Sequence, residues 1–148
     1  MTWYPHVTVA AICRDGDRYL VVEESVDGQI CLNQPAGHLE QGETLIQAVQ
    51  RETLEETAWL FQPAYLVGIY QWQHPHTAIS YLRFAFFGHA NEHRPGIKMD
   101  KGVLNVLWMT MDELRLTKKR HRSPLVMKCL EDYLAGIQIP LEALNHLG

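Results

Sequence analysis

The chain has 148 residues, of which 47% are hydrophobic and 20% are charged, and its net charge is −4. This length and composition predict one globular domain over residues 1–148 with a core of its own. The negative net charge argues against a broad surface for a nucleic-acid polymer. No run of apolar residues approaches the roughly 18 that a membrane helix needs, so we expect no membrane partner.

The cysteines and the N-terminus indicate a cytoplasmic protein. Cys13, Cys31 and Cys129 are scattered and odd in number. Two of them lie in apolar, strand-like surroundings, which favours buried reduced thiols over disulfides. The first residues lack a basic segment followed by an apolar stretch, so we expect no signal peptide.

The first third of the chain predicts short strands separated by tight turns. Runs rich in β-branched and aromatic residues predict these strands over residues 7–13, 18–22 and 30–33. Asp-Gly pairs at 15–16 and 27–28 predict the turns between them. The Pro-Ala-Gly sequence at 35–37 interrupts the third strand and opens a loop before a helix predicted over residues 44–57.

Three more strands follow this helix in the prediction. They cover residues 65–73, 80–89 and 103–109. Residues 74–77 predict a hairpin loop between the first two. Residues 91–101, rich in Pro, Gly and charge, predict a longer mobile loop of the kind that often carries function.

The last third of the chain predicts helices. Thr110 and Glu113 form a capping box that begins a short helix at Met111. A basic cluster at 118–122 is expected to be a solvated connector. Ser123 and Pro124 suit the N-cap and first turn of a helix that continues to about residue 135. Strands flanked by helices predict an α/β fold, an α/β/α sandwich around a mixed β-sheet.

One side of the helix predicted over residues 44–57 begins apolar and ends anionic. At about 100° per residue, its apolar positions share a side with three carboxylates. These carboxylates are Glu52, Glu55 and Glu56. Carboxylates held together repel unless a positive charge lies among them, and Mg²⁺, with Mn²⁺ as a substitute, prefers such oxygen ligands. A solvated, Glu-rich surface helix is the alternative explanation.

The spacing of six residues favours the metal site over the solvated surface helix. Gly37, Glu43, Arg51, Glu52, Glu55 and Glu56 follow the pattern G-x5-E-x7-R-E-x-x-E-E. This pattern resembles the box of the Nudix family, Mg²⁺-dependent hydrolases of nucleoside diphosphates linked to another group. Thr53 and Ala58 depart from it, because the family has an apolar residue and a glycine there. Ala58 implies either about 1 kcal/mol of backbone strain or a helix that ends differently.

The resemblance implies the Nudix fold and roles for the residues of the box. Glu52 and Glu56 are expected to bind Mg²⁺ directly, with the carbonyl of Gly37 as a further ligand. Glu55 either completes the metal shell or takes a proton from the attacking water. Arg51 is expected to orient Glu55 or Glu43. Glu43 is either an organiser or a helix cap, and Glu40 is either an extra ligand or solvated.

The residues that bind substrate are harder to assign from sequence. Arg83 is an unusual charge within an apolar strand, which favours a phosphate or acidic partner. Glu23 ends a predicted strand and either contacts substrate or is exposed, as does its neighbour Glu24. His38 either has a structural role or contacts phosphate. Trp72 either packs in the core or provides a stacking surface for a base. Asp100 is a further carboxylate, on a loop near the site.

Other segments resemble the NudJ branch of the family and cover most of the chain. They lie at 6–10, 20–24, 33–40 and 122–126. This resemblance implies a phosphatase that releases orthophosphate from nucleoside tri- and diphosphates or from small thiamine-pathway diphosphates. The alternatives are a pyrophosphohydrolase of nucleotide sugars or dinucleoside polyphosphates, and a non-catalytic nucleotide-binding Nudix module. We expect a monomer or homodimer with a small-molecule partner.

Overall fold

The computed structural model describes residues 2–100 and 102–148, and the elements below lie within them. The strands are β1 (His6–Asp15), β2 (Arg18–Val26), β3 (Gln29–Asn33), β4 (Ala36–His38), β5 (Trp59–Gln73), β6 (Ser80–His93) and β7 (Val103–Thr110). The helices are α1 (Leu45–Thr57), α2 (Met111–Leu116) and α3 (Leu125–Leu134), with short 3-10 turns at Lys118–Arg120 and Leu141–Ala143. No helix in these ranges is both long and apolar enough to cross a membrane.

The strands form one mixed sheet that divides along β1. Its order is β3-β2-β1-β6-β5, with β4 paired to β1 and β7 paired to β2. β1 runs parallel to β6 and antiparallel to β2 and β4. It pairs with β4 through residues 8–10 but with β2 only through Arg14 and Asp15. The strands on either side of β1 therefore diverge over most of their length.

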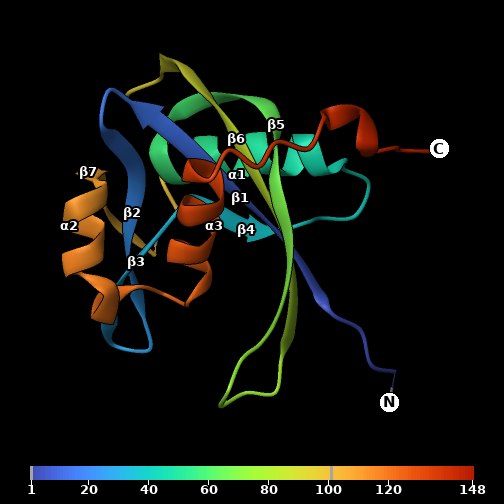
Figure 1. Cartoon of the computed structure of the whole chain (residues 1–148), viewed down its shortest axis with the longest axis horizontal. Coiled ribbons are helices and arrows are strands. Elements are labelled where there is room, and N and C mark those ends of the chain that lie inside the picture. The colour runs from blue at the N-terminus through green and yellow to red at the C-terminus, as the bar shows by residue number, and fades with distance from the viewer. Residues whose placement is uncertain (1, 101) are drawn as a thin grey trace.

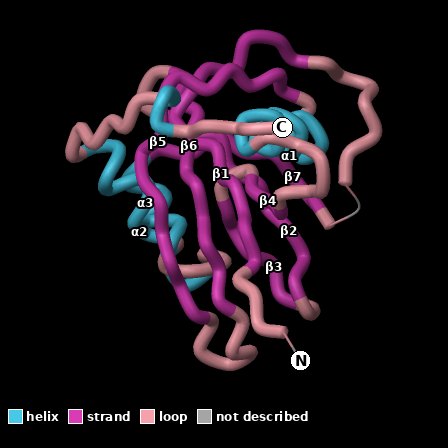
Figure 2. Tube along the Cα trace, turned by 90° about the vertical axis from the view of Figure 1, so that its right-hand side faces the viewer, coloured by secondary structure: helices cyan, strands magenta, loops and turns pink. Residues whose placement is uncertain are grey.

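Helices cover both faces of the sheet (Figure 1 and Figure 2), with α1 on one side and α2 and α3 on the other. Val9 and Ala11 of β1 pack in a core cluster with Ala48 and Val49 of α1. Ile12 of β1 belongs to a second cluster that includes residues of α2 and α3. Alternate side chains of a strand point to opposite faces, so β1 is buried on both sides. The predicted α/β/α sandwich is thus confirmed.

The cap residues of α1 explain where the helix begins and ends. The Thr44 hydroxyl accepts a hydrogen bond from the Gln47 amide (3.0 Å), and the Gln47 side chain accepts one from the Thr44 amide (2.9 Å). The helix ends at Ala58, which adopts a left-handed conformation with φ of 62°. Of the two expectations for Ala58, the structure shows the left-handed conformation, which costs an alanine about 1 kcal/mol.

The structure corrects several predicted boundaries. β5 begins at Trp59 rather than at residue 65, because this edge strand tolerates Pro63 at an irregularity in its pairing with β6. β6 continues to His93, so the predicted loop over 91–101 begins at Arg94, and its last residue lies outside the described residues. β4 was not predicted, because three residues carry too little pattern to distinguish a strand from a turn.

The start of α3 also differs by one residue from the prediction. Pro124 occupies the N-cap position rather than the first turn. Ser123 still accepts a hydrogen bond from the Leu125 amide through its hydroxyl (3.2 Å). The side chain predicted to cap the helix therefore does contact its first turn, from one position earlier.

Candidate active site

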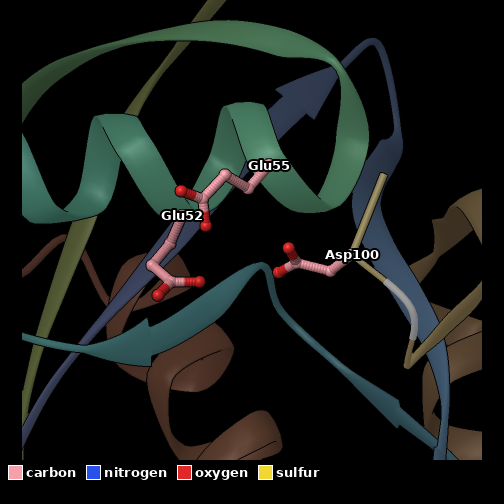
Figure 3. A group of neighbouring side chains, drawn as sticks. All are labelled: Glu52, Glu55 and Asp100. Atoms are coloured by element: carbon pink, nitrogen blue, oxygen red, sulfur yellow. The ribbon is translucent and has the colours of Figure 1, made fainter. Parts of the chain in front are cut away.

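A cluster of carboxylates lies between α1 and the loop that precedes β7. Oxygen atoms of Glu52, Glu55 and Asp100 all lie within 4.8 Å of one another. Figure 3 shows the three side chains directed toward one another, two from α1 and one from the loop. The Asp100 amide donates a hydrogen bond to the carbonyl of Glu55 (3.1 Å), which holds the loop against the helix. Such a concentration of like charge favours the binding of a cation.

Glu56 lies beside this cluster and is buried, with 6% of its surface exposed. One of its oxygens accepts a hydrogen bond from the Ala36 amide of β4 (2.7 Å). Burial, reinforced by the nearby charges of Glu24, Glu52 and Asp100, raises the pKa of Glu56 to about 9. Burial also raises the pKa of Glu52. A bound cation would reverse this penalty by stabilising the ionised forms.

Arg51 of α1 holds the carboxylates of the helix in position and links them to Glu43 in the preceding loop. Its guanidinium donates to Glu52 (2.8 Å), to Glu55 (3.3 Å) and, through two nitrogens, to Glu43 (3.0 and 2.7 Å). It also donates to the carbonyl of His38 in β4 (2.9 Å). These carboxylates raise the pKa of Arg51. Its contacts are those that a positioning residue requires.

Glu43 and Glu40 take different places around this arginine. The hydrogen bond from Arg51 lowers the pKa of Glu43. Glu43 precedes the N-cap Thr44, and the first turn of α1 holds no acidic residue. Of its two predicted roles, the geometry therefore favours the organiser. Glu40 Oε1 lies 3.5 Å from Arg51 Nη1, and the Glu40 side chain is 65% exposed, so this ion pair lies at the surface.

Gly37 fits against the cluster because it has no side chain. A Cβ atom at this position would overlap the carboxylate of Glu52. The backbone of β4 therefore approaches the metal-binding candidates closely. The side-chain donors here are carboxylates, and one of them, Glu56, is buried without a counter-charge among the described residues. These residues fit a hard divalent cation such as Mg²⁺ or Mn²⁺.

On its other side β4 borders a cavity of about 340 Å³, which Ala36, Gly37 and His38 help to line. The cavity lies where the two parts of the sheet diverge. Thr8 and Arg83 line it from β1 and β6, and residues of β2, β3 and β5 and of the start of α3 complete it. Glu52, Glu55, Glu56 and Asp100 do not line the cavity, and β4, which contacts both the cavity and α1, lies between it and these carboxylates.

Arg83 is a buried cation that lines this cavity, with 5% of its surface exposed. It donates to the side-chain oxygens of Gln34 (3.2 Å) and Asn33 (3.4 Å), both neutral. Its Nε atom has no hydrogen-bond partner in the described part of the chain. No carboxylate of the described residues lies within ion-pair distance of it. A buried charge left this way is costly, and a phosphate oxygen would neutralise it.

Glu23 and Glu24 point to different surroundings. Glu23, the predicted substrate residue, hydrogen-bonds to Asn105 and pairs with Arg120 and is absent from the residues that line the cavity. Glu24 lines the cavity and pairs with Arg122 (3.0 Å). The pairing of β2 with β7 shifts register between these two residues. The basic segment at 118–122 is therefore held to β2 by ion pairs and is more than the solvated connector expected.

Comparison with known proteins identifies the family. The NUDIX domain family matches residues 4–129. The chain belongs to the Nudix family. Phosphatase NudJ of Escherichia coli K12 is 38% identical over 141 residues, which cover 95% of this chain and 91% of that protein. The predicted fold and the predicted hydrolase of phosphoanhydrides are confirmed.

Two solved structures extend the comparison. A NUDIX hydrolase from Nitrosomonas europaea has a TM-score of 0.95 and 48% sequence identity, covering 97% of this chain and 98% of that one. The NUDIX domain of Shewanella oneidensis NrtR, complexed with ADP ribose, has a TM-score of 0.72 at 14% identity, covering 93% and 91% of the two chains. At that identity, the second likeness reflects the shared Nudix fold alone.

Some residues of this Nudix site were not singled out from the sequence. Asn33, Thr8 and Tyr81 line the cavity but carried no predicted role. Only Tyr81 of these three could have been predicted from the sequence. Tyr81 lies two residues before Arg83 on β6, and such residues face the same side of a sheet. The other two are recognised only when distant strands are brought together.

Replacing Arg51 with Lys is expected to lower turnover by about 10- to 100-fold with little change in stability. A lysine ammonium cannot span Glu43, Glu52 and the His38 carbonyl as the guanidinium does. Steady-state kinetics at saturating Mg²⁺ measure the effect. Arg115→Lys, on the exposed surface of α2, is the matched control. Equal turnover in both variants would show that Arg51 has no positioning role.

Proposed function

We propose that this Nudix hydrolase cleaves a phosphoanhydride bond of nucleoside tri- or diphosphates, or of small organic diphosphates, and releases orthophosphate in a Mg²⁺-dependent reaction. The observation that carries the proposal is the buried Arg83, for which the described residues supply no counter-charge, in a cavity that shares β4 with the carboxylate cluster. The cavity thus offers an anion site beside a cation site. The likeness to a protein named phosphatase supports the release of orthophosphate.

In this proposal, different residues bind the cation and orient its ligands. Glu52 and Glu56 hold the divalent cation with the Gly37 carbonyl, and Asp100 adds a further oxygen. When bound, this cation neutralises phosphate charge and lowers the pKa of coordinated water. Arg51 fixes the orientation of Glu52. Because stabilising charge and positioning partners dominate phosphoryl transfer, these are the main tasks of the site.

Two further residues act on the substrate and on the water. Arg83, which lines the cavity, binds phosphate oxygens through its guanidinium and so places the diphosphate next to β4. Glu55 accepts the proton of the attacking water, because its side chain is 42% exposed whereas that of Glu52 is 13% exposed. An exposed carboxylate can reach water and return the proton to solvent. Mn²⁺ is expected to substitute for Mg²⁺, since both accept oxygen ligands.

A panel of substrates tests the proposal. Purified protein is incubated with Mg²⁺ and GDP, GTP, a nucleotide sugar and a dinucleoside polyphosphate, and both products of each reaction are identified. Conversion of GDP to GMP and orthophosphate is the expected result. Exclusive cleavage of nucleotide sugars or dinucleoside polyphosphates would replace the proposal by the pyrophosphohydrolase alternative. Binding without turnover of any compound would indicate a non-catalytic module.

Replacing Arg83 with Met is expected to raise KM by about 10- to 150-fold, the loss of a charge-assisted hydrogen bond. The apolar side chain of similar length removes a buried charge, so the melting temperature is expected to stay the same or rise. Arg94→Met, which removes an exposed ion pair with Glu92, is the control. An unchanged KM together with a lower melting temperature would assign Arg83 to structure instead of to substrate.

A further inference from the structure

A row of aromatic rings crosses the sheet beside the cavity. Trp72 of β5 lies opposite Tyr81 of β6, with ring centroids 5.8 Å apart and planes at 24°. Tyr81 continues the row to His6 of β1 (5.6 Å), and His6 to His38 of β4 (5.2 Å). Trp72, Tyr81 and His38 line the cavity. Four strands thus present rings on one face of the sheet.

Packing of the core does not explain the rings of Trp72 and Tyr81. Neither residue belongs to the two hydrophobic clusters formed by the described residues. Both are half-buried, so part of each ring faces the cavity. They lie on the hairpin of β5 and β6, which extends beyond the helices in Figure 1 and Figure 2. Aromatic surface left open inside a polar cavity is typical of a ligand site.

The spacing along β6 relates these rings to the anion site. Tyr81 and Arg83 are two residues apart on one strand, which places their Cα atoms about 6.6 Å apart on the same face. Trp72 and Tyr81 face each other across β5 and β6, and Arg83 lies further along β6, next to Gln34. A molecule with a flat ring at one end and a phosphate at the other therefore matches the order of the groups.

We propose that Trp72 and Tyr81, which we call the ring shelf, bind the flat heterocycle of the substrate by stacking. The ring shelf then makes this Nudix hydrolase select diphosphates that carry an aromatic ring over aliphatic diphosphates. This inference rests on the proposed function and deepens it by naming the class of substrate. The shelf sets the affinity for the ring and takes no part in the chemical step.

Kinetics with a matched pair of substrates test the ring shelf. Trp72→Leu keeps apolar volume but removes the flat ring, and Trp72→Phe keeps a ring. For GDP, Trp72→Leu is expected to raise KM by about 5- to 150-fold with kcat unchanged. Trp72→Phe recovers most of this loss. For dimethylallyl diphosphate, an aliphatic substrate, the KM of both variants stays within about twofold of the unmodified protein.

Two controls keep the result interpretable. Trp3→Leu removes an aromatic residue that is 69% exposed and is expected to change neither KM. Melting temperatures of all variants establish folding, and Tyr81→Leu provides an independent removal of the shelf. Equal losses for GDP and the aliphatic diphosphate in Trp72→Leu, or no loss for either, would overturn the ring shelf while leaving hydrolysis intact.

A binding measurement separates failure of the shelf from failure of the proposed function. GDP added without metal is expected to quench tryptophan fluorescence in the unmodified protein, and this quenching is expected to disappear in Trp72→Leu. Quenching that depends on Trp72 in a protein with no turnover would support the shelf and contradict the hydrolase proposal. Quenching that persists in Trp72→Leu would contradict the shelf.

Discussion

Replacing Glu56 with Gln is expected to lower Mg²⁺-dependent turnover by more than about 100-fold. Glutamine has nearly the same shape and its oxygen can still accept the hydrogen bond that the Ala36 amide donates to Glu56 (2.7 Å). What it removes is the negative charge that binds the cation. The measurement is kcat at saturating Mg²⁺ for the best substrate of the panel. Turnover near that of the unmodified protein would exclude Glu56 from the metal site.

The stability of the Glu56→Gln variant is the control, and its sign follows from the pKa. Burial raises the pKa of Glu56 from 4.5 to about 9 in the metal-free protein. The unfolded chain releases this proton near pH 4.5 and the folded chain retains it. The unmodified, metal-free protein therefore loses stability as the pH rises from about 4.5 toward about 9, and the variant lacks this loss. At pH 8 without metal, we expect the variant to melt at the same or a higher temperature.

Replacing Gly37 with Ala is expected to reduce Mg²⁺-dependent turnover by about 100-fold. The cause is displacement of a metal ligand and not loss of its charge. The added methyl group would occupy the space of the Glu52 carboxylate, so either Glu52 or β4 must move. Because β4 is held by its pairing with β1, we expect Glu52 to be displaced from the position in which it binds the cation. A displacement of this kind lowers the apparent affinity for Mg²⁺ as well as kcat.

Gly102→Ala is the matched control for this variant. A Cβ atom at Gly102 meets no atom within 4 Å. Like Gly37, it has no positive φ, so neither substitution is penalised by the backbone. Titration of activity with Mg²⁺ compares the two. Equal Mg²⁺ dependence in both variants would show that the contact between Gly37 and Glu52 has no functional importance.

The sequence predicted α1 well because local rules decide it. Thr44 caps the helix, and the carboxylates lie on a side whose apolar residues face the core. The spacing of the Nudix box alone placed Glu52, Glu55 and Glu56 within one turn of one another. Their convergence with Asp100 depends on a loop more than forty residues later in the chain, and the sequence supplied only a spare carboxylate there.

The cavity was less accessible to sequence analysis, because it is built by strands that meet only in the fold. Arg83 was recognisable as a charge in an apolar strand. The choice between Glu23 and Glu24 was not, since neighbouring residues of a strand face opposite sides and the sequence does not show which side of β2 borders the cavity. The partners of both residues, Arg120 and Arg122, lie almost a hundred positions away in the chain.

Anomalous diffraction from a crystal that contains Mn²⁺ and a non-hydrolysable GDP analogue tests the central claim most directly. The claim is that the acidic end of α1 and the backbone of β4 together bind a divalent cation next to the diphosphate. The expected result is a Mn²⁺ peak within about 2.2 Å of oxygens from Glu52 and Glu56, with analogue phosphate at the cation. Density for the analogue in the cavity without any anomalous peak beside these carboxylates would contradict it.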